Sequence, residues 1–413
     1  MNDTELYQRV LGLEEPWFVQ RVEMSVEPQR MDIHLAHREG VKWSCPQCEG
    51  GSALACYDHA PVRTWRHLDT CQFQTHVHAR VPRVECQEHG VVNLAVPWAK
   101  PQARFTLLFE RLIIDVLKVT HTIAGVCRLL GITWDEGMAV MKRAVKRGQE
   151  RKQPRTVAHL GVDEKAFRKG HSYMTIVCDL DKSTVEYITE DRKTSSLAEY
   201  FETRTDEQLA GIEAIAMDMW EPYVQATMDH VPLAKEKIVF DKFHIMKQMN
   251  EAVDKVRRSE HRQLKAAPGG GDDTLTGSKY LWLYGKENVP AKSREKFKAL
   301  RDQSLRTGRA WSIKETLRGL WDYQSMGWGR RFFNKWFGWA RRSALEPVKK
   351  AALTFKRHLD NILTYCVHGI TNAAAESLNS RIMALKRISS GRRNKENFKT
   401  AVYFFHGGLD VYP

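Results

Sequence analysis

The spacing of apolar residues changes along the chain of 413 residues, and each change predicts a different kind of structure. From Arg104 to about Gly148, apolar residues recur at the spacing of helices with one buried face. Beyond Val157 the period shortens to that of strands. The alternation predicts an antiparallel meander of three strands, at residues 159–163, 173–179 and 185–189. Turns are expected between them, near residues 168–170 and 181–183.

Helices and strands alternate after the meander, at residues 195–203, 212–218, 222–230, 237–241 and from Lys242 onward. A meander followed by such crossovers is the element order of RNase H-like folds with a mixed sheet. The next stretch, residues 251–355, is basic and mostly helical in pattern, with a glycine-rich linker at 268–273. We expect an α-helical insertion there, after which a helix over residues 371–388 returns to the sheet.

The chain is basic, because Lys and Arg (64) outnumber Asp and Glu (50) and give a net charge of +14. Such a charge favours a polyanionic partner, nucleic acid before membrane. No window approaches the roughly 18 apolar residues that a membrane span needs, and residues 1–17 lack the pattern of a signal peptide. We therefore expect a cytoplasmic protein.

Five of the eight cysteines fall before residue 90, which favours a metal site over disulfides. Cys45 and Cys48 are separated by two residues, and so are Cys86 and His89. Two such pairs can hold one tetrahedral zinc ion in a ribbon, and a site closed by four ligands is structural. Unrelated thiols are the alternative, and further candidate ligands are Cys56, Cys71, His59 and His67.

A helix over residues 123–130 is predicted to end at Gly131, and Thr133 and Glu136 match a capping box that begins a second helix. Helix, turn and basic helix is the form of a DNA-binding helix-turn-helix. Two packed helices with a solvated basic face are the alternative. The candidate DNA contacts are Thr133, Lys142, Arg143, Lys146 and Arg147.

Three carboxylates form the candidate active site. Asp163 and Asp218 each end an apolar strand, and these two strands can lie side by side in a mixed sheet. Glu376 lies on a predicted helix. Acidic side chains that meet repel one another unless cations lie between them, so such a cluster predicts a metal site for phosphoryl transfer. Other acids remain possible members: Asp179, Asp181, Glu164 and Asp241.

Four sequence blocks together resemble the insertion-sequence L-three family of bacterial DDE transposases. They are LGVDEKAFRKGHSY from Leu160, DM from Asp218, FDKFH from Phe240 and TNAAAESLNS from Thr371. Two departures from the family pattern are His89, where many relatives have Cys, and Ala374-Ala375, where a glycine and an apolar residue are frequent.

The resemblance implies a DDE triad at Asp163, Asp218 and Glu376 that uses two Mg (or Mn) ions, with Asp241 and His244 in support. It also implies a structural zinc ribbon and a helix-turn-helix. The expected plan is a multidomain α/β chain: an N-terminal segment (1–40), a zinc-ribbon-like module (41–98), a helix-turn-helix region (104–150), an RNase H-like catalytic domain (156–250 and 356–413, the second part with a basic tail) and an α-helical insertion (251–355).

The expected function is transposition of an insertion sequence, by hydrolysis of one DNA strand at the element's inverted ends and attack of the freed 3′-hydroxyl on target DNA. A homodimer or larger assembly on nucleoid DNA is expected from the family. A DNA-binding regulator without chemistry and a junction-resolving nuclease are the alternatives. Further candidate DNA contacts are Lys386, Arg387, Arg392 and Arg393 in the tail, and Trp328, which we expect in a loop of the insertion where it could stack on a displaced base. The alternatives are a solvated basic helix for the tail and an α-helical core for the tryptophans.

Overall fold

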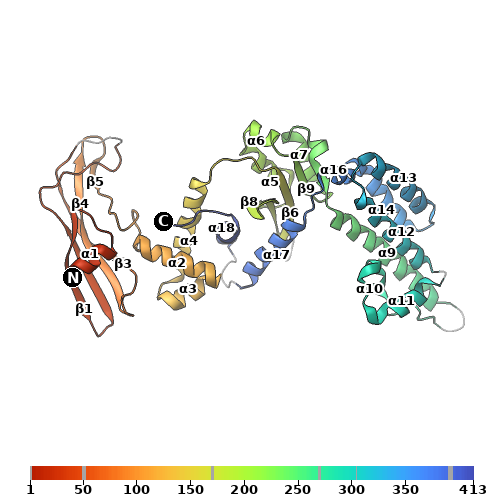
Figure 1. Cartoon of the computed structure of the whole chain (residues 1–413), viewed down its shortest axis with the longest axis horizontal. Helices are drawn as coiled ribbons and strands as arrows, with labels where there is room; N and C mark the ends of the chain where they lie inside the picture. Colours follow the sequence, from red (N-terminus) through yellow and green to blue (C-terminus); the bar gives the residue numbers. More distant parts are fainter. Residues whose placement is uncertain (1, 49–52, 169–171, 268–270, 304, 389–393) are drawn as a thin grey trace. The chain divides into compact units, whose positions relative to one another are not determined.

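The computed structural model describes residues 2–48, 53–168, 172–267, 271–303, 305–388 and 394–413 (Figure 1). It contains two compact units. The first comprises Met1–Lys152, Leu385–Phe405 and Leu409–Pro413, and the second comprises Gln153–Ala384 and His406–Gly408. No helix among the described residues is long and apolar enough to cross a membrane.

The first unit begins with helix α1 (Asp3–Val10) and a five-stranded sheet. The strands are β1 (Trp17–Ser25), β2 (Arg30–His37), β3 (Asp58–Arg66), β4 (Gln74–Cys86) and β5 (Gly90–Asn93). In this sheet they lie in the order β1-β2-β4-β3, with β5 paired to β4. Trp17, Ile33, Trp65 and Val77 are buried in one cluster beneath it. β2, before the expected boundary at residue 40, pairs directly with β4, after it, so both strands belong to one sheet.

The predicted helix-turn-helix is formed by α3 (Ile123–Leu130) and α4 (Trp134–Arg151), which pack on α2 (Leu107–Thr120). Gly131 adopts a left-handed conformation (φ 65°) at the end of α3, as its position predicts. The predicted capping box of Thr133 and Glu136 is present at the start of α4.

The C-terminal helix α18 (Lys395–His406) belongs to the helix-turn-helix unit. Its Ala401 and Phe404 are buried in the same cluster as Ile113 and Met141 of α2 and α4. Residues 356–413 were expected to complete the catalytic domain, but Leu385–Phe405 and Leu409–Pro413 pack with the first unit. An apolar helical face alone does not indicate which of two cores it joins.

A buried carboxylate fixes α4 against α2. Glu110 is 1% exposed, and its oxygens accept hydrogen bonds from Arg143 (2.7 Å) and Arg147 (3.2 Å). Arg147 also donates to the carbonyl of Val411 at 2.7 Å. Two residues that we expected to contact DNA thus hold the helical core together, since a buried carboxylate needs such partners.

The second unit contains a mixed sheet in the order β10-β9-β6-β7-β8. The strands are β6 (His159–Arg168), β7 (Ser172–Asp179), β8 (Thr184–Glu190), β9 (Ala214–Met217) and β10 (Ile238–Phe240), and the crossover helices are α5 (Thr194–Glu202), α6 (Asp206–Ala210), α7 (Glu221–His230) and α8 (Ala234–Lys237). The meander and the parallel crossovers confirm the predicted RNase H-like arrangement. The predicted turn at 168–170 lies partly outside the described residues.

The helical insertion begins with α9 (Lys242–Lys265), a helix within which the expected boundary at residue 251 falls. The others are α10 (Lys279–Leu283), α11 (Arg294–Arg301), α12 (Arg306–Arg318), α13 (Met326–Arg342), α14 (Glu346–Arg357), α15 (Leu359–Leu363) and α16 (Tyr365–His368), with short 3-10 turns at Lys286–Asn288, Ala291–Ser293 and Gly319–Asp322 (η3). α17 (Ala373–Ile388) follows. The first residues of the predicted linker, 268–270, lie outside the described part of the chain.

The tryptophans of the insertion are partly core and partly surface. Trp282, Trp311 and Trp336 are buried in a cluster that is continuous with the sheet. Trp328, by contrast, is 59% exposed and lies in the first turn of α13. The expectation of a loop around Trp328 is therefore wrong, because the flanking glycines are accommodated within the helix.

Candidate functional site

The register of three parallel strands brings carboxylates to one level of the sheet. Gly161 of β6 lies opposite Ala216 of β9, and Asp163 and Asp218 each follow two residues later. Phe240 of β10 lies opposite Met217, so the next residues, Asp241 and Asp218, are also level. The prediction that the strands of Asp163 and Asp218 are neighbours is confirmed.

His244 links two of these carboxylates. Because it lies in the first turn of α9, which starts directly after Asp241, its ring faces the end of the sheet. Its Nδ1 is 2.5 Å from Oδ1 of Asp218 and 3.2 Å from Oδ2 of Asp241. The other oxygen of Asp241 accepts a hydrogen bond from the backbone N–H of Asn372 at 3.3 Å.

A glycine allows the start of α17 to pack closely on β6. A Cβ atom on Gly161 would lie 2.6 Å from Cδ2 of Leu180, 2.8 Å from Oδ1 of Asn372 and 3.1 Å from Cβ of Ala375. Ala375 is fully buried at this contact, and Glu376 is the next residue. The small side chains therefore set how near Glu376 comes to the sheet.

Asn379 lies one turn beyond Glu376 and contacts the first carboxylate directly. Its Nδ2 donates to Oδ2 of Asp163 at 2.5 Å, and Nζ of Lys165 lies 3.1 Å from the same oxygen. No role for Asn379 or Lys165 was predicted from the sequence. Their one signal is spacing, because Asn379 follows Glu376 on one helical face and Lys165 follows Asp163 on one strand face.

Six side chains form two groups of three. Within each group, the potential ligand atoms all lie within 4.8 Å of one another. Asp163, Glu164 and Asp218 form the first group, and Asp241, His244 and Glu376 form the second. Glu376 thus groups with the two residues expected only to support the site. Of the other candidate acids, Asp179 pairs with Arg155 at 2.7 Å and Asp181 pairs with His159 at 2.9 Å.

Burial and mutual repulsion make the charged forms of these acids costly. Burial raises the pKa of Glu164, and the charges of Asp218 and Asp163 raise it further. Burial likewise raises the pKa of Asp218 and of Glu376. Burial lowers the pKa of His244, but hydrogen bonds to Asp218 and Asp241 outweigh this effect and raise it to about 10. A carboxylate-rich set of this kind fits a hard divalent cation.

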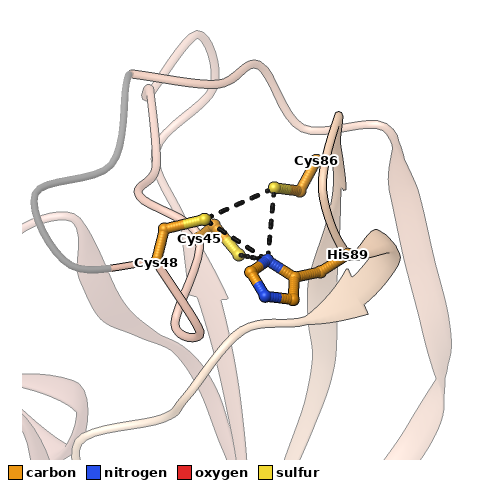
Figure 2. Close-up of side chains that lie close together, drawn as sticks. All are labelled: Cys45, Cys48, Cys86 and His89. Atoms are coloured by element: carbon orange, nitrogen blue, oxygen red, sulfur yellow. Dashed lines mark hydrogen bonds between the residues drawn. The ribbon is translucent and has the colours of Figure 1, made fainter.

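Cys45, Cys48, Cys86 and His89 come together in the first unit, as Figure 2 shows. Nδ1 of His89 lies 3.8, 3.3 and 3.6 Å from the sulfurs of Cys45, Cys48 and Cys86, and the last two sulfurs are 3.6 Å apart. Thiolates around tetrahedral zinc are separated by about 3.8 Å, given Zn–S bonds of about 2.3 Å. The four donors therefore fit a structural zinc ion.

The rival ligands lie elsewhere. Cys56 is 4.0 Å from Nε2 of His59 and bonds the carbonyl of Asp58, and His67 is buried against Thr106 at 2.9 Å. Cys71 is exposed. These contacts leave Cys45, Cys48, Cys86 and His89 as the one cluster of metal-ligating side chains in the described part of the first unit.

The candidate DNA contacts differ in exposure. Lys142 and Lys146 are exposed on α4 and Thr133 is exposed at its N-cap, whereas Arg143 and Arg147 bind Glu110. Lys386 and Arg387 lie in the last turn of α17. Arg392 and Arg393 lie outside the described residues.

A helix-turn-helix in the same chain as an RNase H-like sheet with clustered carboxylates is the architecture of enzymes that cut and join DNA. Residues 160–402, more than half of the chain, match a family model described as "Transposase". Residues 94–145 match the "Helix-turn-helix domain of transposase family ISL3", and residues 42–89 match the "zinc-finger of transposase IS204/IS1001/IS1096/IS1165". The chain belongs to the ISL3 (insertion-sequence L-three) family of transposases.

Two curated relatives match along nearly their whole length. The chain is 26% identical to the transposase for insertion sequence element IS1557 of Mycobacterium tuberculosis, over 96% of this chain and 94% of the relative. It is also 26% identical to the transposase for insertion sequence element IS1001 of Bordetella parapertussis, over 96% of this chain and 97% of the relative.

The contact between Gly161 and α17 gives the first prediction. Gly161→Ala should lower the free energy of unfolding by about 1–3 kcal/mol, because the added methyl group overpacks the contact with Asn372 and Ala375. It should also weaken Mn²⁺ binding, because Glu376 moves away from the sheet. Calorimetry measures both. Gly327→Ala is the control, because a Cβ there meets only Oγ of Ser325, at 3.7 Å. Wild-type stability and affinity in Gly161→Ala would contradict the account.

Proposed function

We propose that Asp163, Asp218 and Glu376 hold two divalent cations, Mg²⁺ or Mn²⁺, and that this site hydrolyses one strand at each element end and joins the freed 3′-hydroxyl to target DNA. The observation that carries the proposal is the shared level of Asp163 and Asp218 on β6 and β9. All three residues fall within the matched transposase region. When bound, such ions activate a water or hydroxyl group and stabilise the leaving oxygen.

The protein's own groups prepare this site. Asn379 and Lys165 bind Oδ2 of Asp163 and fix its orientation. His244 holds Asp218 and Asp241 at one level, and Asp241 in turn accepts the backbone N–H of Asn372 just before α17. We assign Asp241 and His244 a supporting role, in which they position the residues that contact the ions.

The remaining parts serve recognition. We propose that zinc on Cys45, Cys48, Cys86 and His89 stabilises the N-terminal module, and that exposed residues of α4 contact the inverted repeats. Lys386, Arg387, Arg392 and Arg393 are proposed as further contacts. Two or more copies would pair the two ends, on nucleoid DNA in the bacterial cytoplasm.

The proposed triad is tested by isosteric substitution. Asp163→Asn, Asp218→Asn and Glu376→Gln should each abolish cleavage and joining of a labelled element end in Mg²⁺, because each removes a charge that holds metal at little cost in volume. Binding of the end in a gel-shift assay should stay close to wild type. Asp181→Asn, an exposed acid outside both groups, is the control. A variant that still transfers strands is not part of the triad.

The proposed zinc site is tested by metal analysis. Wild-type protein should contain about one zinc ion per chain, and Cys45→Ser or Cys86→Ser should lose it and bind the element end less tightly, because the ion is part of the folding energy of a small module. Cys71→Ser, at an exposed thiol, should retain the metal. Purified wild-type protein without zinc would exclude the ribbon.

Substitutions on α4 should affect either DNA affinity or stability, depending on whether the residue contacts DNA or belongs to the helical core. Lys142→Gln should weaken binding to the inverted end more than to random DNA if Lys142 reads bases, and a phosphate contact would instead lower both affinities and reduce the salt slope by about one unit. Arg143→Gln should mainly lower the melting temperature, because it leaves buried Glu110 with one partner fewer. Equal loss on both DNAs with Lys142→Gln would make α4 a nonspecific clamp.

A further inference from the structure

A groove begins at Phe243, the residue before His244, and runs along the first turns of α9. Two adjoining cavities of ≈ 530 and ≈ 440 Å³ share Phe243, Met246, Asn250 and Leu283 in their walls. Three of these residues lie on one face of α9, at helical spacing, and Leu283 ends α10. Cavities of this size hold a small organic group.

Phe243 is the feature of this groove that calls for an explanation. Its side chain is 55% exposed, although apolar side chains of the helix further along, such as Met249 and Val253, are buried. It follows Asp241 by two residues, and its ring lies 5.5 Å from the ring of His244. A flat apolar surface is therefore presented to solvent directly beside the candidate active site.

Cations outnumber acids around this apolar surface. Lys242 lines the larger cavity, together with Glu315 and Asp322, and Lys247, Lys255 and Lys279 line the smaller one, together with Glu251 and Asp254. Within the described residues, no salt bridge to a carboxylate involves any of these four lysines, whereas Arg318 of the larger cavity is bound by Glu287 and Glu315. Lys242 and Lys279 lie instead over the rings of Tyr365 and Tyr280, at 5.6 and 5.4 Å. Ammonium groups without a carboxylate partner, beside an exposed aromatic ring, complement a ligand that has an apolar face and an anionic backbone.

We propose that this groove binds a nucleotide that leaves the duplex next to the cut phosphodiester, with its base stacked on Phe243 and its phosphates near Lys242 and Lys247. This inference rests on the proposed function, because it assumes that the neighbouring carboxylates cut DNA. A base within a duplex has both faces covered, so only a displaced base can stack on a protein ring. Stacking of this kind tolerates any base, and lysines neutralise the backbone.

In this proposal, Phe243 takes the stacking role that was expected of Trp328. Trp328 is also exposed, but Arg331 lies over its ring at 5.1 Å, and it lines neither cavity. Trp328→Ala is thus a matched control for Phe243→Ala, since both substitutions remove an exposed aromatic side chain from the first turn of a helix.

The test uses the full chain and an inverted-repeat duplex with 2-aminopurine next to the cut site. In Ca²⁺, which is used to slow cleavage, wild-type protein and Phe243→Trp should quench the fluorescence of the displaced base, and Phe243→Ala should leave it bright. In Mg²⁺, Phe243→Ala should cut the intact duplex at least about tenfold more slowly, the lower part of the range for loss of one stacked base. Removal of the flanking base should bring its rate close to that of wild type on the same substrate.

The outcomes separate this inference from the proposed function. If wild-type protein cuts no element end, the proposed function fails. If wild-type protein cuts and Phe243→Ala matches it in rate and fluorescence, the groove does not bind the base. An equal rate loss on intact and abasic DNA, with a lower melting temperature, would assign Phe243 a structural role and overturn the inference. So would a defect found in Trp328→Ala but absent from Phe243→Ala.

Discussion

The candidate site depends on the shared register of β6, β9 and β10. Neighbouring strands lie about 4.8 Å apart, so acids at one level of adjacent strands are forced into contact range. A slip of one residue would turn each carboxylate to the other face of the sheet. Repulsion among Asp163, Asp218 and Asp241 is reduced by Asn379, Lys165 and His244. The pKa of Asp218 and that of Glu164 are still raised, first by burial and then by the neighbouring carboxylates. Bound cations would relieve the rest.

Two helices take their positions from this edge of the sheet. α9 starts directly after Asp241, so His244 and Phe243 occupy neighbouring positions of one helical turn and face the acids and the groove respectively. α17 approaches β6 because Gly161 and Ala375 leave room for it, and it supplies Glu376 and Asn379 one turn apart. Chemistry and substrate positioning can therefore be coupled through short stretches of backbone.

Much of this was predictable from local signals. Apolar strands that end in Asp163 and Asp218, the paired metal ligands, and the Gly131 and Thr133 boundaries are all short-range patterns, and the structure places them as expected. Long-range packing could not be read in this way. The sheet that joins residues before and after position 40, the docking of α18 on the helix-turn-helix, and the capture of Arg143 and Arg147 by Glu110 each depend on partners distant in sequence.

Direct location of metal ions tests the central claim most sharply. Crystals of the full chain grown with Mn²⁺, with diffraction data collected at the manganese edge, would show which side chains hold the ions. We predict anomalous peaks within bonding distance of Asp163, Asp218 and Glu376. A fully occupied Mn²⁺ site elsewhere in the chain, with no peak at these carboxylates, would contradict the account.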